Sequence, residues 1–491
     1  MSLTRSVSAK WLAHIVTMAV GFFLMPYVMR TIGESGYGAW VFVNSIAGYS
    51  SLLYMGFGAT VCRFVADARA RQDWIRLNAV CSGVFAVYLV AAAAVMLVAC
   101  GLAWAAPALG DWGDVPISDV RIAMILLGLN IAVGMLGSVH GGVLIAAQRF
   151  DLYSGIEAAT ALTRLGLTVA LLQKQQALVT LALIFLCVTL FENGVTVWLA
   201  RRESPTLAIR RRFVSRAVLR ECFSFSAYTA LRGMAVQLIY LSDVVVIGIM
   251  LGKDAAVPYY VALRLVQMVH GPLEKIGDVV LPKAGALHAA GDRTGLQALC
   301  SRAMGLSLLL AAAFLIGGAY FGDLFITTWM GPGLSDSWMV LVILSAAQVV
   351  GMPLIMLRQT LMAVGAVRRP ALIDIGQALI NLALSIALAP VWGLVGVAVG
   401  TLVPLLIADL FILLPYGLRA LRFDGRRLVE DVLRPQLVPL GVLVLYCEGV
   451  GNLHPQPGWL SVGAIGAGAA GVLAAVLFGQ WRRPRAMAAA G

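Results

Sequence analysis

The sequence has few charged residues. Of its 491 residues only 12% are Asp, Glu, Lys or Arg, whereas 60% are hydrophobic; ordinary globular proteins carry about 25% charged residues. A soluble protein of this length would expose much of that apolar surface to water, and disordered or coiled-coil chains need more charge. Unbroken apolar runs such as Val84–Ala103 also exclude a transmembrane β-barrel, whose strands alternate apolar and polar residues. The composition therefore predicts an all-α, polytopic membrane protein.

Residues that build metal sites and disulfide frameworks are equally scarce. The chain has five histidines and seven scattered cysteines, with no CxxC motif and no Cys/His cluster. We therefore expect no metal, no cofactor and no disulfide framework. The longest predicted extracytoplasmic loop, residues 105–118, is too short for a catalytic domain, so we expect no catalytic residue and no enzyme. The net charge of +12 fits basic cytoplasmic loops rather than nucleic-acid binding.

Long apolar segments follow one another along the whole chain. A helix needs about 20 apolar residues to cross about 30 Å of hydrocarbon. By this criterion the sequence predicts about fourteen spans, with twelve as the alternative. Their approximate limits are 9–30, 37–62, 77–104, 119–147, 154–173, 177–200, 223–251, 255–282, 301–321, 337–363, 370–389, 392–418, 435–450 and 459–480.

The basic residues of the loops orient these spans. With the N-terminus placed inside, nearly all basic loop residues are cytoplasmic, and the opposite side holds only Arg30, Arg121, Lys174 and Lys253. Because one missed span would invert every later loop, this asymmetry supports an even number of spans. We predict a multi-pass membrane protein with both termini in the cytoplasm.

The two halves of the chain repeat one another at a shift of 219 residues. Coinciding positions include Gly33 with Gly252, Gly58 with Gly277, Asp73 with Asp292, and Cys81-Ser82 with Cys300-Ser301. The shift maps the first span onto the seventh, so the halves share one orientation, as parallel repeats do.

The repeat predicts a domain organisation. Residues 1–200 form an N-lobe of six spans, residues 223–418 a C-lobe of six, and residues 419–491 the last two spans and a basic tail. Residues 201–222 form a basic cytoplasmic linker between the lobes, either as a topological anchor or as an interfacial helix on anionic headgroups.

Five segments carry a family resemblance. They are RTIGESGYGAW at Arg30–Trp40, MGFGATVCRFVA at Met55–Ala66, SDVVVIGIMLG at Ser242–Gly252, YYVALR at Tyr259–Arg264 and VVLP at Val279–Pro282. In order and spacing they resemble the polysaccharide-biosynthesis flippases of the multidrug/oligosaccharidyl-lipid/polysaccharide (MOP) exporter superfamily, and within it the O-antigen type. The resemblance covers about residues 10–400.

This resemblance implies two six-helix lobes around a central cavity that opens alternately to either side. It also implies a location in the bacterial cytoplasmic (inner) membrane and outward movement of a polyprenyl-pyrophosphate-linked glycan for O-antigen, capsule or exopolysaccharide assembly. The partners would be membrane lipids and the polysaccharide polymerase and glycosyltransferases of the same pathway. The peptidoglycan-precursor branch of the superfamily carries basic residues in its first span, whereas Trp11–Met29 has only His14. This difference argues against the peptidoglycan precursor as the substrate. A multidrug cation antiporter of the same superfamily is the alternative function, and a membrane-embedded glycan polymerase or ligase is a more distant one.

Ionisable residues inside the spans are costly in lipid and are therefore functional candidates. A pyrophosphate needs fixed cations, and arginine suits it through its planar fork of donors. We assign substrate binding to Arg264, Arg232, Lys275 and Arg63. We assign ion coupling or charge pairing to Asp243, Glu274, Glu192 and Asp409.

Depth within the helices predicts which of these charges meet. Asp243 and Arg264 lie at similar distances from Lys253, as do Arg232 and Glu274, so each pair should face across a helical hairpin.

The remaining charges inside the spans have structural interpretations. We expect Glu157, Arg164 and Glu192 to form a structural cluster. Arg358 should extend toward cytoplasmic water, and Asp374 should reach water at its helix end.

Overall fold

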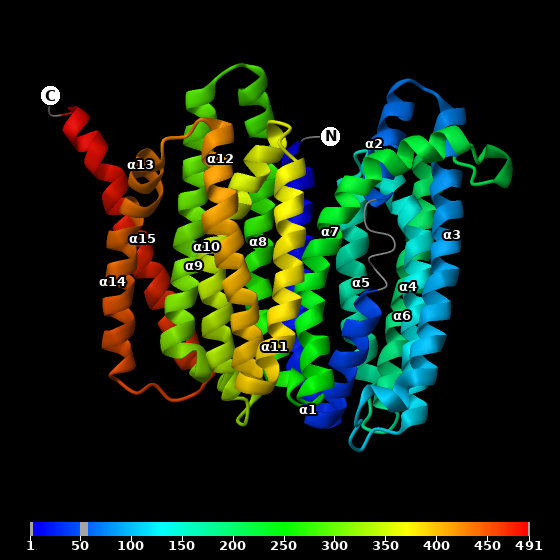
Figure 1. Ribbon diagram of the computed structural model, residues 1–491, viewed down its shortest axis with the longest axis horizontal. Helices are drawn as coiled ribbons and strands as arrows, with labels where there is room; N and C mark the ends of the chain where they lie inside the picture. The colour runs from blue at the N-terminus through cyan, green and yellow to red at the C-terminus, as the bar shows by residue number, and fades with distance from the viewer. Residues whose placement is uncertain (1–2, 50–56, 490–491) are drawn as a thin grey trace. The chain divides into compact units, whose positions relative to one another are not determined.

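The computed structural model describes residues 3–49 and 57–489 (Figure 1). This part of the chain forms helices joined by turns and loops and contains no strand, which confirms the all-α prediction. The side chains of Arg232, Glu274 and Lys275 lie outside the described residues. The helices are α1 (Leu3–Tyr49), α2 (Phe57–Ala70), α3 (Trp74–Ala105), η2 (Ala106–Leu109), α4 (Ile117–Ala146), α5 (Phe150–Leu171), α6 (Ala177–Glu203), η3 (Arg211–Phe213), α7 (Arg216–Met250), α8 (Ala256–Ala289), α9 (Arg293–Met330), α10 (Asp336–Ala363), α11 (Arg368–Leu406), the π-helix η4 (Ile407–Leu413), α12 (Leu414–Leu421), α13 (Gly425–Leu428), the π-helix η5 (Val429–Leu433), α14 (Arg434–Gly451) and α15 (Trp459–Ala489).

Eight helical stretches of the described chain are long and apolar enough to cross a bilayer. Two of these stretches contain a glycine with non-helical backbone, Gly33 in α1 (φ 80°) and Gly393 in α11 (φ 59°). Each of the two is therefore a pair of helices joined at a turn, where the sequence places a boundary between two spans. The protein is a multi-pass membrane protein, and the count of fourteen spans stays a prediction.

The chain divides into two compact units, Met1–Val257 and Pro258–Gly491. In the first unit α7 packs on α1, α2 and α3. This unit therefore includes a helix that the repeat assigns to the second half, and its boundary does not coincide with the linker at 201–222. The lobes themselves stay a prediction.

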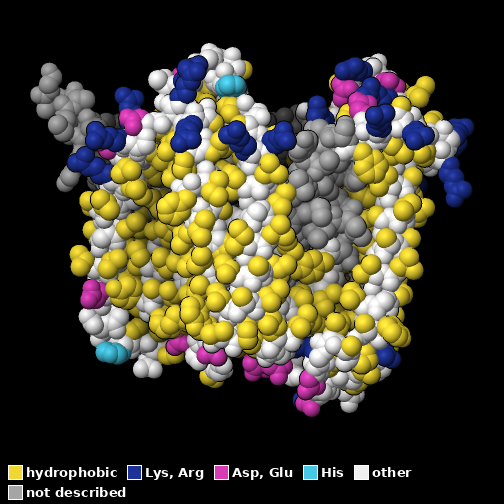
Figure 2. Space-filling model, in the orientation of Figure 1, with side chains coloured by type: hydrophobic (Ala, Val, Ile, Leu, Met, Phe, Trp, Pro, Cys, Tyr) yellow, Lys and Arg dark blue, Asp and Glu magenta, His cyan; other side chains and the backbone are white. Residues whose placement is uncertain are grey.

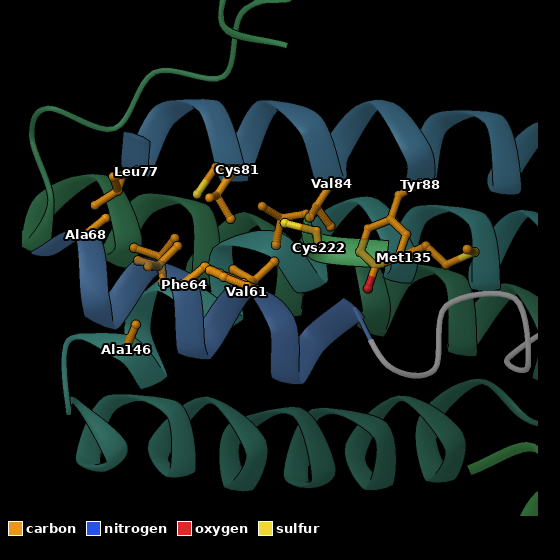
Figure 3. Close-up of a cluster of buried hydrophobic side chains, with 14 of the residues drawn as sticks. Val61, Phe64, Ala68, Leu77, Cys81, Val84, Tyr88, Met135, Ala146 and Cys222 are labelled. Atoms are coloured by element: carbon orange, nitrogen blue, oxygen red, sulfur yellow. The ribbon is translucent and has the colours of Figure 1, made fainter. Parts of the chain in front are cut away.

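The core of the first unit lies where α2, α3, α4 and α7 meet. Phe64 of α2, Cys81 and Tyr88 of α3, Met135 of α4 and Cys222 of α7 are buried there. Figure 3 shows these side chains converging from the surrounding helices. An apolar core between helices fixes their relative positions, so the polar groups that these helices carry are held on a rigid frame.

The internal repeat is present in the local structure of the turns. Residues with positive φ occur in the same order, at nearly the same shift, in both halves of the described chain. The first half has Gly33, Gln72, Gly110, Gly113, Gln148 and Gln176, and the second has Gly252, Gly291, Gly331, Gly333, Gly365 and Gly393. Asp73 and Asp292 cap α3 and α9 in the same way, each accepting a backbone N–H bond from the first turn. These matches confirm the repeat seen in the sequence.

Charged side chains gather at the two ends of the second unit (Figure 2). Basic residues such as Lys283 and Arg369 lie near the α8–α9 and α10–α11 turns, whereas Asp336 and Glu448 lie at the opposite turns. An apolar band separates the two ends in Figure 2. This is the asymmetry on which the predicted cytoplasmic side rests.

The linker does not form the interfacial helix that was one of its two interpretations. Between Glu203 and Arg216 only the three residues of η3 are helical. Pro205 interrupts the helix because it has no backbone N–H, and the Asn78 side chain holds the next residues extended by bonding to the backbone of Thr206 and Ala208.

Candidate functional site

Arg264 is an exposed cation on an otherwise buried stretch of α8. Its neighbours Leu263 and Leu265 are buried, whereas the Arg264 side chain is exposed. The Nε atom donates to the Tyr260 hydroxyl at 2.7 Å and Nη1 donates to Gln267 at 3.2 Å. The guanidinium also lies 4.8 Å from the centre of the Tyr260 ring. The Tyr260 hydroxyl and the Gln267 side chain, each within one turn of the helix, thus orient the planar donor fork of the guanidinium.

Asp243 is a buried carboxylate in the first unit, with 3% of its surface exposed. It lies beside Tyr49 of α1, whose hydroxyl forms a hydrogen bond with Ser242. The predicted approach of Asp243 to Arg264 joins two different compact units and stays a prediction.

The other predicted hairpin pair, Arg232 with Glu274, lies outside the described side chains, as does Lys275. Arg63 is exposed on α2, with its guanidinium 5.8 Å from the centre of the Phe64 ring.

The first unit carries a charged cluster on α5 and α6. Glu157 and Arg164 of α5 interact electrostatically with Glu192 of α6. The Arg164 guanidinium lies 4.4 Å from the centre of the Phe185 ring. Glu157 is exposed, and Glu192 and Arg164 are half-buried. The cluster is therefore only partly enclosed by the protein.

The second unit carries a buried triad of Arg358, Asp374 and Asp409. Arg358 of α10 donates from Nε to Asp374 at 3.0 Å, and its Nη2 approaches Asp409 Oδ1 at 2.6 Å. The exposed fractions are 7% for Arg358, 7% for Asp374 and 1% for Asp409. Asp409 lies on η4, where π-helical geometry changes the direction of a side chain relative to the α-helices on either side.

The triad corrects two expectations from the sequence. Arg358 does not extend toward cytoplasmic water, and Asp374 does not reach water at its helix end. Each finds a partner inside the protein, because Arg358 bonds directly to Asp374 and also to Asp409 from a more distant part of the sequence. The sequence placed all three residues in spans, but it contained no signal that they share one depth and one face.

The two clusters are related by the repeat. The shift that pairs Gln176 with Gly393 also pairs Glu157 with Asp374 and Glu192 with Asp409. The arginine does not follow this relation: it comes from α5 in the first unit and from α10 in the second.

Lys253 closes the end of the first unit that the sequence predicts to be extracytoplasmic. Its ammonium group donates to the backbone carbonyls of Leu109 and Asp111 and lies 3.9 Å from the centre of the Trp112 ring. Burial lowers the pKa of Lys253. On α1, Gly38 packs directly on the Lys253 backbone. The α7–α8 turn is thereby held against α1 and the α3–α4 loop.

An apolar pocket of about 350 Å³ lies in the second unit. Residues of α9, α14 and α15 form most of its walls, including Phe321, Cys447 and Ile465, and all lining residues are apolar or glycine. The sequence carries no signal for this pocket, because its walls come from helices that resemble any other apolar span.

Comparison with known proteins identifies the family. The model of the family described as polysaccharide biosynthesis protein matches residues 3–287, more than half of the chain. The uncharacterized membrane protein EpsK of Bacillus subtilis (strain 168) is 22% identical over 393 residues, which cover 79% of this chain and 77% of that protein.

Solved structures show the same fold. The lipid II flippase MurJ in an inward closed conformation has a TM-score of 0.75 at 13% identity and covers 98% of this chain and 100% of its own. An inward-facing multidrug resistance MATE family transporter of the MOP superfamily has a TM-score of 0.69 at 13% identity and covers 87% of this chain and 100% of its own. The chain has the fold of MOP-superfamily transporters, and it belongs to the family of polysaccharide biosynthesis proteins.

Proposed function

We propose that this protein is a flippase that moves a polyprenyl-pyrophosphate-linked oligosaccharide from the cytoplasmic to the outer leaflet of the inner membrane by alternating access. Its family supports a role in polysaccharide assembly, and a protein of the same fold is named as a lipid II flippase. The observation that carries the proposal is Arg264, an exposed cation within a long helix of a membrane protein.

Each part of such a substrate meets a suitable chemical group. The pyrophosphate carries the strongest charge and needs a cation on its way through a medium of low dielectric constant. Arg264, held by Tyr260 and Gln267, offers a planar fork of N–H donors from which phosphate oxygens can accept hydrogen bonds. The polyprenyl chain is a hydrocarbon, and the apolar pocket between α9, α14 and α15 is lined for such a chain.

Alternating access requires one side of the protein to close while the other opens. The contacts of Lys253 with Trp112 and Gly38 would then have to break whenever the outer side opens. We expect both chain termini to be cytoplasmic. We also expect the glycosyltransferases of the pathway to act before transport and the polymerase to act after it.

The test is complementation of a flippase-deficient bacterial strain, scored by surface polysaccharide. Arg264→Ala should abolish export at normal protein level in the membrane, and Arg264→Lys should restore it partly, because lysine lacks the planar fork. Arg302→Ala, which removes an exposed arginine from α9, is the matched control and should export normally. Full export by Arg264→Ala would remove this residue from the mechanism.

A multidrug cation antiporter is the second candidate, because MATE transporters share the fold. It predicts that expression protects cells from cationic drugs and that Arg264→Ala leaves this protection intact. Drug protection without any complementation of polysaccharide export would favour the antiporter.

A further inference from the structure

Residues 204–215, here called the strap, are fixed along the side of α3. The Asn78 amide donates to the Thr206 carbonyl at 3.0 Å and accepts from the Ala208 N–H at 2.8 Å. One turn further on, the Ser82 hydroxyl accepts from the Arg210 N–H at 3.1 Å. Asn78 and Ser82 are both buried by this contact. The strap is therefore a built part of the fold.

The two sides of the strap differ in chemistry. Leu207 and Ile209 pack against the core of the first unit. Arg210, Arg211 and Arg212 are exposed, and none of them takes part in an ion pair within the described chain. The strap itself contains no acidic residue. Three guanidinium groups are thus presented together on a fixed backbone.

The strap lies at the level expected for lipid headgroups. The 32 residues of α3 span about 48 Å, more than the roughly 30 Å of hydrocarbon in a bilayer. Asn78 and Ser82 lie in the first turns of this helix, so the strap runs beside the part of α3 that emerges from the hydrocarbon. Trp198, near the end of α6, is 59% exposed, as is typical of tryptophans at a membrane interface. In Figures 1 and 2 the connection between α6 and α7 carries basic side chains at this end of the first unit.

The repeat supplies a counterpart that differs in charge. In the second unit Gln297 of α9 donates to the backbone carbonyl of Arg422 at 2.9 Å, just as Asn78 holds the strap. The segment after α12 likewise carries exposed arginines, but Asp424, Glu430 and Asp431 stand among them. The same device therefore occurs twice, and only the strap is free of acidic residues.

We propose that the strap is a binding surface for anionic phospholipid headgroups, which Arg210, Arg211 and Arg212 grip while Asn78 and Ser82 hold the backbone in place. Charge complementarity selects this partner, since the cytoplasmic leaflet is negatively charged and clustered arginines at its surface attract acidic lipids. The inference concerns the lipid surroundings of the protein and holds whatever substrate it carries.

The test uses the purified full-length protein in bilayers of phosphatidylcholine that contain spin-labelled phosphatidylglycerol or spin-labelled phosphatidylcholine. The native protein should retain the acidic probe in preference to the neutral one. In the variant Arg210→Gln/Arg211→Gln/Arg212→Gln, the preference for the acidic over the neutral probe should fall by at least about fivefold. The matched variant Arg422→Gln/Arg426→Gln/Arg427→Gln removes the same charge from the counterpart segment and should lose clearly less.

Two further variants separate charge from placement. Arg210→Lys/Arg211→Lys/Arg212→Lys should keep most of the preference, because lysine retains the charge. Asn78→Ala/Ser82→Ala keeps every arginine but releases the strap, and it should weaken the preference. An unchanged preference in the glutamine variant, or an equal loss in the matched variant, would overturn the proposal. Thermal unfolding of each variant in detergent shows that the loss does not come from misfolding.

Discussion

The carboxylates of α5 and α6 in the first unit and those of α11 and η4 in the second occupy equivalent positions of the repeat, yet their surroundings differ. Glu157 and Glu192 are exposed or half-buried, whereas Asp374 and Asp409 are enclosed with Arg358. Enclosed charges lose so much hydration that each depends on its partner. Charges with access to water or ligand can change partners at little cost. The comparison teaches that the second cluster is enclosed and holds helices together, whereas the first is only partly enclosed, so a role in transport can be tested there separately from stability.

The largest expected effect is the loss of the buried arginine. Arg358→Leu leaves two carboxylates without their cation and should lower the free energy of unfolding by about 3–5 kcal/mol. Thermal unfolding of the purified protein measures this. Arg164→Leu in the first cluster should cost about 1 kcal/mol or less. Equal losses in the two variants would erase the distinction between the clusters.

The triple variant Arg358→Leu/Asp374→Leu/Asp409→Leu is the control for this prediction. It removes all three charges together and should recover much of the stability that Arg358→Leu loses, since apolar residues of similar size replace buried ion pairs at little cost. If stability does not recover, side-chain packing rather than charge determines the stability of the folded protein at this site.

The second prediction separates transport from stability. Glu192→Gln should reduce polysaccharide export with an unchanged unfolding temperature, because the half-buried carboxylate is available to ions or substrate. Asp409→Asn should instead lower the free energy of unfolding by about 1–3 kcal/mol, because it weakens the bond to Arg358. Export assays and unfolding of the same two variants decide the matter, and normal export by Glu192→Gln would assign that cluster a purely structural role.

A smaller effect is expected at the equivalent helix caps Asp73 and Asp292. The Gly295 N–H and the Thr294 hydroxyl donate to Asp292 and lower the pKa of its carboxyl group. A lowered pKa in the folded state means that the stabilisation is present above the unfolded value of about 3.9 and is lost as the pH falls through the folded value. Asp292→Ala should therefore lower the unfolding temperature at pH 7 more than at pH 3. A loss that does not depend on pH would contradict this account.

The smallest effect concerns the turns in which glutamine and glycine correspond. Gln148 has a φ of 58°, and its counterpart Gly365 has a φ of 84°. A left-handed backbone strains every residue but glycine, so Gln148→Gly should stabilise the protein by up to about 1 kcal/mol. Gly365→Gln should destabilise it by a similar amount. Unfolding temperatures of the two variants should move in opposite directions.

Much of the fold was predictable because it depends on composition and periodicity. The apolar runs predict the helices, and the coincidence of Asp73 with Asp292 in the repeat agrees with their equivalent capping of α3 and α9. The helix boundaries near Gly33 and Gly393 followed from the same patterns.

The candidate site was less predictable, because depth along a helix says nothing about direction around its axis. Arg358 looked like a residue near a helix end, and only the packing of α10 against α11 and η4 brings it to Asp409. The extended strap was hidden for a similar reason. Its bonds come from Asn78 and Ser82, two ordinary polar residues more than a hundred positions earlier in the chain.

The packing of α7 in the first unit has a consequence for synthesis. Gly48 of α1 lies against Leu241, and Phe42 lies against Gly248, so the α1 surface is completed by α7, a helix that the ribosome makes after α1 to α6 and the strap. A nascent chain that has inserted only residues 1–215 therefore keeps this surface unfilled in the membrane and must wait for α7 before its first helix is fully packed. Co-expressed fragments should assemble when the break falls after α7, and they should be degraded as separate pieces more readily when it falls before α7.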